Sequence, residues 1–388
     1  MRSHRSWRMF VLLASLMMFG CRGTPPPHAP LTQGPTKAQA RAWLLSGNYQ
    51  ALDAAFSAIQ AEYRTGARSD ESLHIAFLAL YDADAELRPA YDGWVRAYPR
   101  SYVALLARGI YHRKVGQDRR GGAFSSETSD SQFQGMQAEY ALAMQDFTAS
   151  KQLDARPLLT LSNELDILAN FSDAGRMRAL LDESRKIDPA NVVVRRLYLT
   201  YLEPRWGGSE QQMQDFVEEA RTEGLPAPKV RSLEGAIIAD HAHTAESAGD
   251  DATAEREYRQ ALEMGDEGCA ACFGMVLLRE QKFLDAIPLL TRAITADPGD
   301  SESLYWRGVA YLGVGSSKEG FTDLLEAAQL GYPDAQNRIG ILYLTGLADV
   351  TVQNTDLGEK WLRECAAKGN QDCTRNLQLA LQFYSIRK

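Results

Sequence analysis

The sequence predicts an all-α protein, a superhelical solenoid of helix-turn-helix repeats. Apolar residues recur at the three- and four-residue spacing of amphipathic helices along most of the chain after residue 37. In the C-terminal half, small and large apolar residues also recur with a period of about 34 residues, and prolines such as Pro298 and Pro333 stand near the ends of that period. A repeat of this length, made of two amphipathic helices, is typical of a stacked array.

The first twenty residues have the form of an export signal. Arg2, Arg5 and Arg8 precede the uncharged apolar run 9–20, which is shorter than the roughly twenty residues needed to span a membrane. Gly20-Cys21 resembles a bacterial lipobox, and this resemblance implies that Cys21 is lipidated and becomes the mature N-terminus. The alternative is ordinary secretion, with Cys21 as a spare thiol.

Residues 21–37 are predicted to be a flexible tether, because they are rich in Pro, Gly and Thr and cannot form a core. Arg22, directly after the cysteine, resembles a signal for sorting to an outer membrane. The expected location is therefore the bacterial cell envelope, with a lipid anchor as the only membrane contact and the protein facing the periplasm. The formal net charge is −8 even though it includes three N-terminal arginines. Such an acidic body argues against nucleic acid or anionic lipid as the main partner.

Residues 38–230 are predicted to form an irregular helical domain. Pro99 and Ser101 provide a break and an N-cap before a helix, and the Gly/Ser-rich stretch 121–135 is predicted to be a loop. The helices expected in this domain are 42–66, with a break at Gly47-Asn48, then 71–80, 91–98, 102–114, 136–154, 174–187 and 209–221.

Several short motifs in this domain resemble one bacterial family. They are Trp94 with Pro99-x-Ser101, then Arg108-Gly109, and above all PRWGGS at 204–209. These motifs resemble the domain of unknown function numbered 4034, a family of helical envelope-associated proteins with no assigned activity. The resemblance covers 38–224, and it implies a similar fold but no reaction.

Residues 235–334 contain three copies of the period. A small residue where two helices cross lets their axes approach, and a large apolar residue one turn away fills the adjacent gap. The pattern resembles the tetratricopeptide repeat. The packing positions are Ala254, Tyr258 and Ala261 in the first copy, Gly274, Leu277, Ala286, Leu290 and Ala293 in the second, and Gly308, Tyr311, Gly320, Leu324 and Ala327 in the third.

Residues 335–388 carry a longer version of the same pattern. Gly340, Tyr343 and Gly346 are followed, after a longer gap, by Trp361. This spacing resembles a SEL-like repeat, a relative of the tetratricopeptide unit with a loop between its helices. The stretch 377–386 is then expected to be a capping helix.

Two cysteines flank the last turn of this unit. Cys365 is expected in the last turn of one helix and Cys373 in the first turn of the next, with Gly369-Asn370 between them. This arrangement can bring the Cα atoms within the roughly 4.4–6.8 Å that a disulfide requires. Exported proteins are oxidised by default, so a bridge is predicted. The same spacing also resembles the bridge of cysteine-rich SEL-like proteins.

Cys269 and Cys272 form a C-x-x-C pair at the start of a helix, and three interpretations stay open. They are a redox-active pair, a local disulfide and two unpaired packing thiols. A zinc site shared with Cys365 and Cys373 is not expected, because the pairs lie in different units of the array. His241 and His243 are two positions apart and point to different sides of a helix, so no metal site is predicted there.

The chain contains no complete catalytic signature, and neither a cofactor nor a small-molecule substrate is predicted. The predicted function is a non-catalytic envelope lipoprotein that binds another envelope protein or peptide along the concave face of the array. One alternative is an immunity-type lipoprotein that neutralises a delivered toxin. The other is a periplasmic thiol–disulfide oxidoreductase that uses Cys269 and Cys272. Resemblance to tetratricopeptide proteins implies that first-helix residues line the concave face, here Met275, Leu278, Arg279, Tyr305, Val309 and Leu312.

Overall fold

The computed structural model describes residues 31–121, 128–367 and 369–384, and these form helices and turns without a β-strand. The predicted signal peptide and Cys21 lie outside this part of the chain. Among the described residues, no helix is long and apolar enough to cross a membrane. The α-helices are α1 (Lys37–Leu45), α2 (Tyr49–Arg64), α3 (Asp70–Phe77), α4 (Arg88–Ala97), α5 (Tyr102–Arg120), α6 (Asp130–Lys151), α7 (Leu158–Ala169), α8 (Ala174–Ile187), α9 (Val193–Thr200), α10 (Glu210–Thr222), α11 (Ala227–Ser247), α12 (Asp251–Glu263), α13 (Ala270–Arg279), α14 (Phe283–Ala296), α15 (Ser301–Gly313), α16 (Ser317–Gln329), α17 (Pro333–Thr345), α18 (Thr355–Ala367) and α19 (Gln371–Tyr384). Short 3-10 turns are η1 (Leu78–Leu80), η2 (Ala85–Leu87), η4 (Pro204–Trp206) and η5 (Glu267–Cys269).

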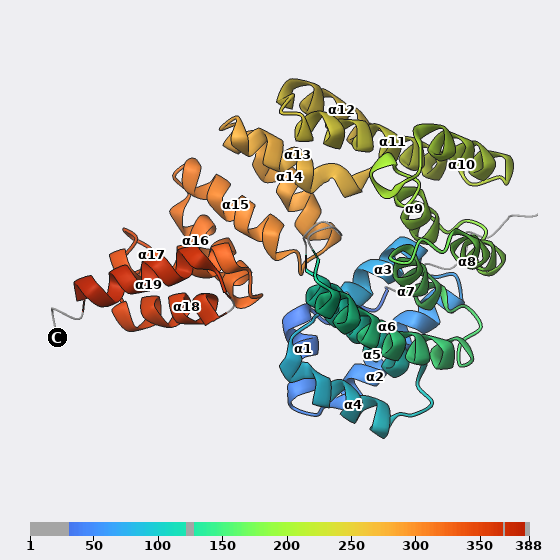
Figure 1. Ribbon diagram of the computed structural model, residues 1–388, viewed down its shortest axis with the longest axis horizontal. Coiled ribbons are helices and arrows are strands. Elements are labelled where there is room, and N and C mark those ends of the chain that lie inside the picture. The colour runs from blue at the N-terminus through green and yellow to red at the C-terminus, as the bar shows by residue number, and fades with distance from the viewer. Residues whose placement is uncertain (1–30, 122–127, 368, 385–388) are drawn as a thin grey trace, which may run out of the picture.

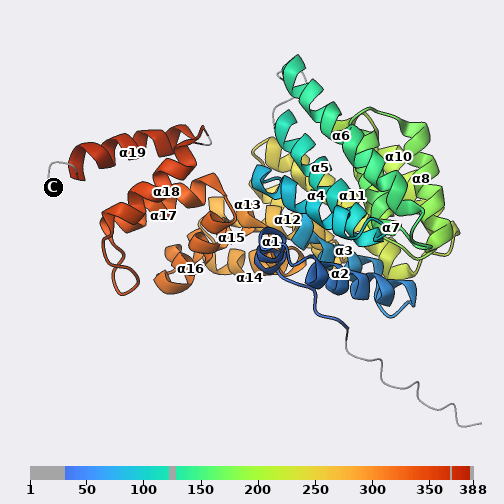
Figure 2. The same ribbon diagram turned by 90° about the horizontal axis from the view of Figure 1, so that it is seen from below.

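Two regions with different cores follow one another along the chain (Figure 1). The N-terminal helices share one large apolar core that extends from Ala40 to Ile237, whereas smaller apolar clusters follow each other from Ala242 to Ala380. Figure 2 shows the N-terminal helices on one side and the pairs from α15 to α19 extending to the other. The long helix α11 joins the two regions, because its first half packs in the N-terminal core and its second half in the first cluster of the array.

Three helix pairs of the array, α13–α14, α15–α16 and α17–α18, meet at a glycine on the first helix and a leucine on the second. A Cβ atom added to Gly274 would lie 2.8 Å from Leu290 Cγ, and the same distance separates such an atom on Gly308 from Leu324 Cγ. A Cβ atom on Gly340 would also lie 2.8 Å from the Cγ of its leucine, Leu362. The glycine therefore lets the two axes approach while the leucine fills the gap. The prediction of an all-α solenoid of helix-turn-helix repeats is confirmed.

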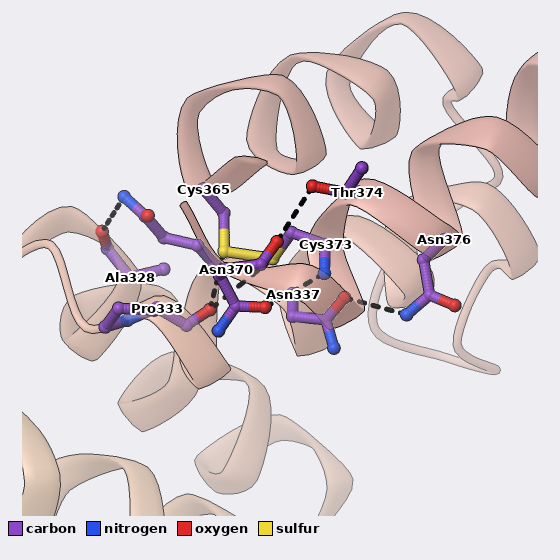
Figure 3. Close-up of a disulfide and its surroundings, with 9 residues drawn as sticks. Ala328, Pro333, Asn337, Cys365, Asn370, Cys373, Thr374 and Asn376 are labelled. Carbon is purple, nitrogen blue, oxygen red and sulfur yellow. Dashed lines mark hydrogen bonds between the residues drawn. A yellow bond between two sulfur atoms is a disulfide. The ribbon is translucent and has the colours of Figure 1, made fainter. Parts of the chain in front are cut away.

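The predicted bridge between Cys365 and Cys373 is present, with a Cα–Cα distance of 5.8 Å. It joins the end of α18 to the first turn of α19, where Asn370 caps α19 by accepting a hydrogen bond from Cys373 N at 2.9 Å. Figure 3 shows the bridge beside the start of α17, with the Pro333 carbonyl oxygen 3.2 Å from Cys365 Sγ. The disulfide therefore holds the C-terminal helix against the last repeat.

The predicted tether is not free over its described part. Thr32 donates its backbone N–H to Glu62 at 2.6 Å, and its carbonyl accepts from Arg68 at 2.6 Å. Glu62 and Arg68 also form an ion pair with each other at 2.7 Å, which holds both side chains in position to bind the backbone of Thr32. Within the described part of the predicted tether, Thr32 is therefore held against the N-terminal helices.

The predicted loop at 121–135 is also too long at its C-terminal end. Helix α6 begins at Asp130, and Ser129 and Gln132 form a reciprocal capping box at its start. This box pairs backbone N–H groups that a helix N-terminus otherwise leaves unpaired. The polar residues that indicated a loop therefore begin a helix.

Candidate functional site: a junction cleft and the first-helix face

A cleft of about 210 Å³ lies where the N-terminal region meets the first repeat, and we call it the junction cleft. Helix α9 and the turn η4 form one wall, and α11, the end of α12 and the start of α13 form the other. Its lining residues are Arg196, Leu199, Thr200, Glu203, Arg205, Ala236, Ala239, Asp240, His243, Tyr258, Asp266, Gly268, Cys269 and Cys272.

Asp266 is the most buried ionisable group of this cleft, since its side chain is fully inaccessible to solvent. It caps the turn after α12, where its Oδ1 accepts from the Gly268 N–H at 3.0 Å and also pairs with Arg196 of α9. Its other oxygen, Oδ2, is buried and has no hydrogen-bond partner among the described residues. Burial raises the pKa of Asp266, and the nearby Arg196 guanidinium opposes that rise.

Two further carboxylates face the same space. Glu203 is buried and accepts from Arg205 Nε at 2.6 Å. Burial raises the pKa of Glu203, Arg205 opposes the rise, and the charge of Asp240 adds to it. Asp240 is itself buried, and within the described residues its carboxylate makes no hydrogen bond or ion pair. The cleft therefore holds three carboxylates and two guanidinium groups, and each guanidinium already has a carboxylate partner.

Cys269 and Cys272 line the cleft as free thiols. The Cys269 thiol is buried and donates to the backbone carbonyls of Asp266 at 3.1 Å and Tyr258 at 3.7 Å. Burial strongly raises the pKa of Cys269 and also raises that of Cys272, with the nearby acids adding to both shifts. A raised pKa disfavours the thiolate that disulfide exchange requires. Of the three interpretations of this pair, the structure therefore favours unpaired packing thiols.

A second surface is formed by the first helices of the repeats. We call it the first-helix face, meaning the exposed and half-buried side chains of α11, α13, α15 and α17, among them His243, Met275, Tyr305, Trp306 and Arg338. Neighbouring helices of this face are in contact, because Arg279 of α13 pairs with Glu246 of α11 at 2.8 Å.

The structure corrects the expectation for Leu278 and changes that for Arg279. Leu278 is only 9% exposed and belongs to the apolar cluster of the first two repeats, so it does not lie on the binding surface. Arg279 is exposed, but it pairs with both Glu246 and Asp251 at 2.8 Å. It therefore connects two repeats within the chain.

Of the remaining predicted residues, Met275, Tyr305 and Val309 lie on the first-helix face, where Met275 and Val309 are half-buried. Leu312 is also half-buried, but its side chain packs against Gly320 of α16. Tyr305 is also half-buried and contacts the ring of Trp306 at a centroid distance of 4.9 Å and that of Tyr332 at 5.2 Å. Trp306 and Tyr332 are not among the residues predicted from the sequence. The signal that could have found Trp306 is its place directly beside Tyr305 in the repeat.

Exposed aromatic surface also lies beside the junction cleft. Trp206 in the PRWGGS turn is 59% exposed, and the guanidinium of Arg205 lies 5.9 Å from its ring.

A larger polar cleft of about 560 Å³ occurs in the N-terminal region, where Gln60 Oε1 is buried without a partner in the described structure. Among the described residues, no group of three or more His, Cys, Asp or Glu side chains is placed to hold a metal ion.

Residues 173–240 match the family model described as "Domain of unknown function (DUF4034)". The match begins at the N-cap of α8 and ends within α11, so it includes the PRWGGS turn. The resemblance expected over 38–224 is therefore corrected in its extent, because the motifs at Trp94, Pro99 and Arg108 lie outside the matched residues. No curated protein matches the chain.

Among solved structures, helical-repeat proteins are similar to this chain. One of them is a protective antigen of uropathogenic Escherichia coli strains with an SLR fold. It is 14% identical to this chain, and the match covers 89% of this chain and 80% of the antigen, with a TM-score of 0.40. A Sel1 repeat protein from Oxalobacter formigenes is 14% identical over 92% of this chain and 98% of its own, with a TM-score of 0.38. YrrB, described as a TPR protein with an unusual peptide-binding site, is 18% identical over 48% of this chain and 92% of its own, with a TM-score of 0.24.

Proposed function

We propose that this protein is a non-catalytic lipoprotein of the bacterial cell envelope that binds another protein or a peptide through its first-helix face. The observation that carries this proposal is the aromatic cluster of Tyr305, Trp306 and Tyr332 on that face. Tyr and Trp are enriched among the residues that dominate binding energy at protein interfaces. A half-buried cluster of this kind is held in place by packing and still offers ring surface to a partner.

The position of the cluster supports the same function. Tyr305 packs with the apolar cluster of α15–α17, whereas Trp306 packs with that of α11–α15. The two adjacent rings therefore lie where two consecutive repeats meet. A partner lying along the array would contact both repeats at once, which is how stacked repeats provide an extended binding surface.

The chemistry of the thiols favours binding over catalysis. The pKa values of Cys269 and Cys272 are both raised, whereas reactive thiols in oxidoreductases have lowered pKa values. We therefore place the thiol–disulfide oxidoreductase hypothesis below the binding hypothesis.

The envelope location is part of the proposal and rests on the sequence pattern that ends at Cys21. Replacement of Cys21 by serine removes the lipid attachment site. We expect wild-type protein in the membrane fraction, labelled by radioactive palmitate, and Cys21→Ser protein without label. Equal fractionation and labelling of the two proteins would contradict the lipid anchor.

Quantitative capture of partners tests the binding face. Trp306→Ala removes an aromatic side chain from the first-helix face, and Thr322→Ala is a matched control because Thr322 is exposed on the second helix α16. We expect a protein that co-purifies with the wild type and with Thr322→Ala to be lost with Trp306→Ala. A partner retained equally by all three proteins would show that binding occurs elsewhere.

A further inference from the structure

We propose that the junction cleft accepts one positively charged side chain, a lysine or an arginine, of the protein or peptide that lies on the first-helix face. This inference rests on the proposed function and names the chemistry that the partner must present. No covalent step is involved.

The charge of the cleft points to a cation. Arg196 is paired with Asp266, and Arg205 is paired with Glu203, so both resident guanidinium groups are satisfied. Asp266 Oδ2 is buried without a hydrogen-bond partner among the described residues. The Asp240 carboxylate takes part in no hydrogen bond or ion pair of the described residues. The cleft therefore has more acceptor oxygens and more negative charge than its own guanidinium groups pair with.

Asp240 is the strongest single indication of a ligand. It lines the cleft and is buried, yet its carboxylate has no hydrogen bond or ion pair among the described residues. A buried charged group without a partner destabilises the fold. An ammonium or guanidinium group that enters the cleft donates to this carboxylate and offsets that cost.

The size of the cleft limits the ligand to one side chain. Its volume of about 210 Å³ is below the roughly 300–1,000 Å³ of pockets that enclose drug-sized ligands. A lysine or arginine side chain supplies a long apolar stem and a charged head. The stem suits the apolar wall that Ala236 and Ala239 provide, and the head suits the acids.

The cleft adjoins the proposed binding face. His243 lines the cleft and also belongs to the first-helix face. Cys272 of the cleft and Trp306 of the aromatic cluster pack against the same apolar cluster of α11–α15. A chain that contacts the aromatic cluster therefore passes near the cleft, and one of its side chains can enter.

Protection of Cys272 from alkylation measures occupancy of the cleft directly. The probes are Nα-acetyl-lysine N-methylamide and the corresponding arginine compound, and Nα-acetyl-norleucine N-methylamide is the neutral control of similar length. The alkylation rate of the Cys272 peptide of the full chain is read by mass spectrometry at constant ionic strength. With a dissociation constant of about 5 mM, about 20 mM of a cationic probe slows the reaction about fivefold, because only the free cleft reacts.

Two variants connect this protection to the acids. Asp240→Asn removes an unpaired charge without breaking an ion pair, so the fold is retained and we expect most of the protection to be lost. Asp285→Asn is the matched control, because Asp285 is exposed on α14 and does not line the cleft. Asp266→Asn should also abolish protection, and Asp240→Asn keeps the test decisive if loss of the Arg196 pair unfolds that variant.

The outcomes separate this inference from the proposed function. Protection by the cationic probes alone, lost in Asp240→Asn and kept in Asp285→Asn, supports it. No protection by either cation, equal protection by norleucine, or full protection in Asp240→Asn overturns it. Partner capture that depends on Trp306 without any protection of Cys272 overturns the cleft alone. If Cys272 is protected but partner capture does not depend on Trp306, the proposed binding face is overturned and the cation site remains.

Discussion

Gly308 and Leu324 set the spacing of the pair α15–α16, because a Cβ atom on Gly308 would lie 2.8 Å from Leu324 Cγ and 3.0 Å from the Gly320 carbonyl oxygen. We predict that Gly308→Ala destabilises the array by about 1–3 kcal/mol, the usual cost of forcing an extra carbon into a packed interior. Urea unfolding followed by circular dichroism measures the change.

The control for this substitution is Gly175→Ala. Gly175 also lies in a helix, but an added Cβ atom meets only Asp173 Oδ1, at 4.0 Å. Without a clash, alanine is expected to stabilise the helix by about 0.5–1 kcal/mol. Equal effects of the two substitutions on stability would show that close packing does not explain why position 308 is a glycine.

We expect the disulfide to stabilise the C-terminal helices α18 and α19. Replacing both Cys365 and Cys373 by serine opens a short loop and should lower the free energy of unfolding by about 2–3 kcal/mol in the chain-entropy model. Because the bridge joins α18 to α19, amide hydrogen exchange should accelerate in these helices and not in α5 or α7. Exchange that is unchanged in α19 would contradict this role.

His74 predicts a loss of stability in acid. Burial lowers the pKa of His74 to about 4, Arg113 adds to the shift, and its Nδ1 has no hydrogen-bond partner in the described structure. Its pKa in the unfolded chain is about 6.5, so its contribution is complete above that pH and is lost as the pH falls from about 6.5 to about 4. The loss amounts to at most about 3 kcal/mol, and His74→Leu should remove it.

Tryptophan fluorescence, to which Trp94 contributes from its fully buried place in the N-terminal core, reports this unfolding. Urea midpoints measured at several pH values between 4 and 7 should fall less steeply with decreasing pH in His74→Leu than in the wild type. The same slope in both proteins would mean that His74 is not held neutral by the fold.

The thiol pair predicts slow reactivity. Because burial raises the pKa of Cys269, its alkylation at pH 7 should be more than about tenfold slower than that of a free thiol, and Cys272 should react before it because it is only half-buried. Wild type and Cys269→Ser should show the same background activity in a disulfide-exchange assay. Exchange that is fast in the wild type and absent from Cys269→Ser would restore the oxidoreductase hypothesis.

The parts of the structure that could be predicted are those that depend on local or periodic patterns. Gly308 and Leu324 lie one helix apart in a repeated motif, and Cys365 and Cys373 flank a single turn. The junction cleft could not be predicted, because Asp266 is buried only when α9 brings Arg196 against it from a distant part of the chain.

The same limit explains the errors at single residues. The repeat pattern places Leu278 on a first helix, but only the packing of neighbouring repeats shows that its side chain faces inward. Polar residues near Asp130 indicated a loop, whereas the reciprocal hydrogen bonds of Ser129 and Gln132 begin a helix there.

Site-specific photocrosslinking in cells tests the central claim most directly. Benzoylphenylalanine is placed at Trp306 on the first-helix face, or at Thr322 on the exposed side of α16 as the control. We expect one recurrent crosslinked partner from position 306 and none from position 322. Crosslinks of equal yield from both positions, or none from position 306, would contradict it.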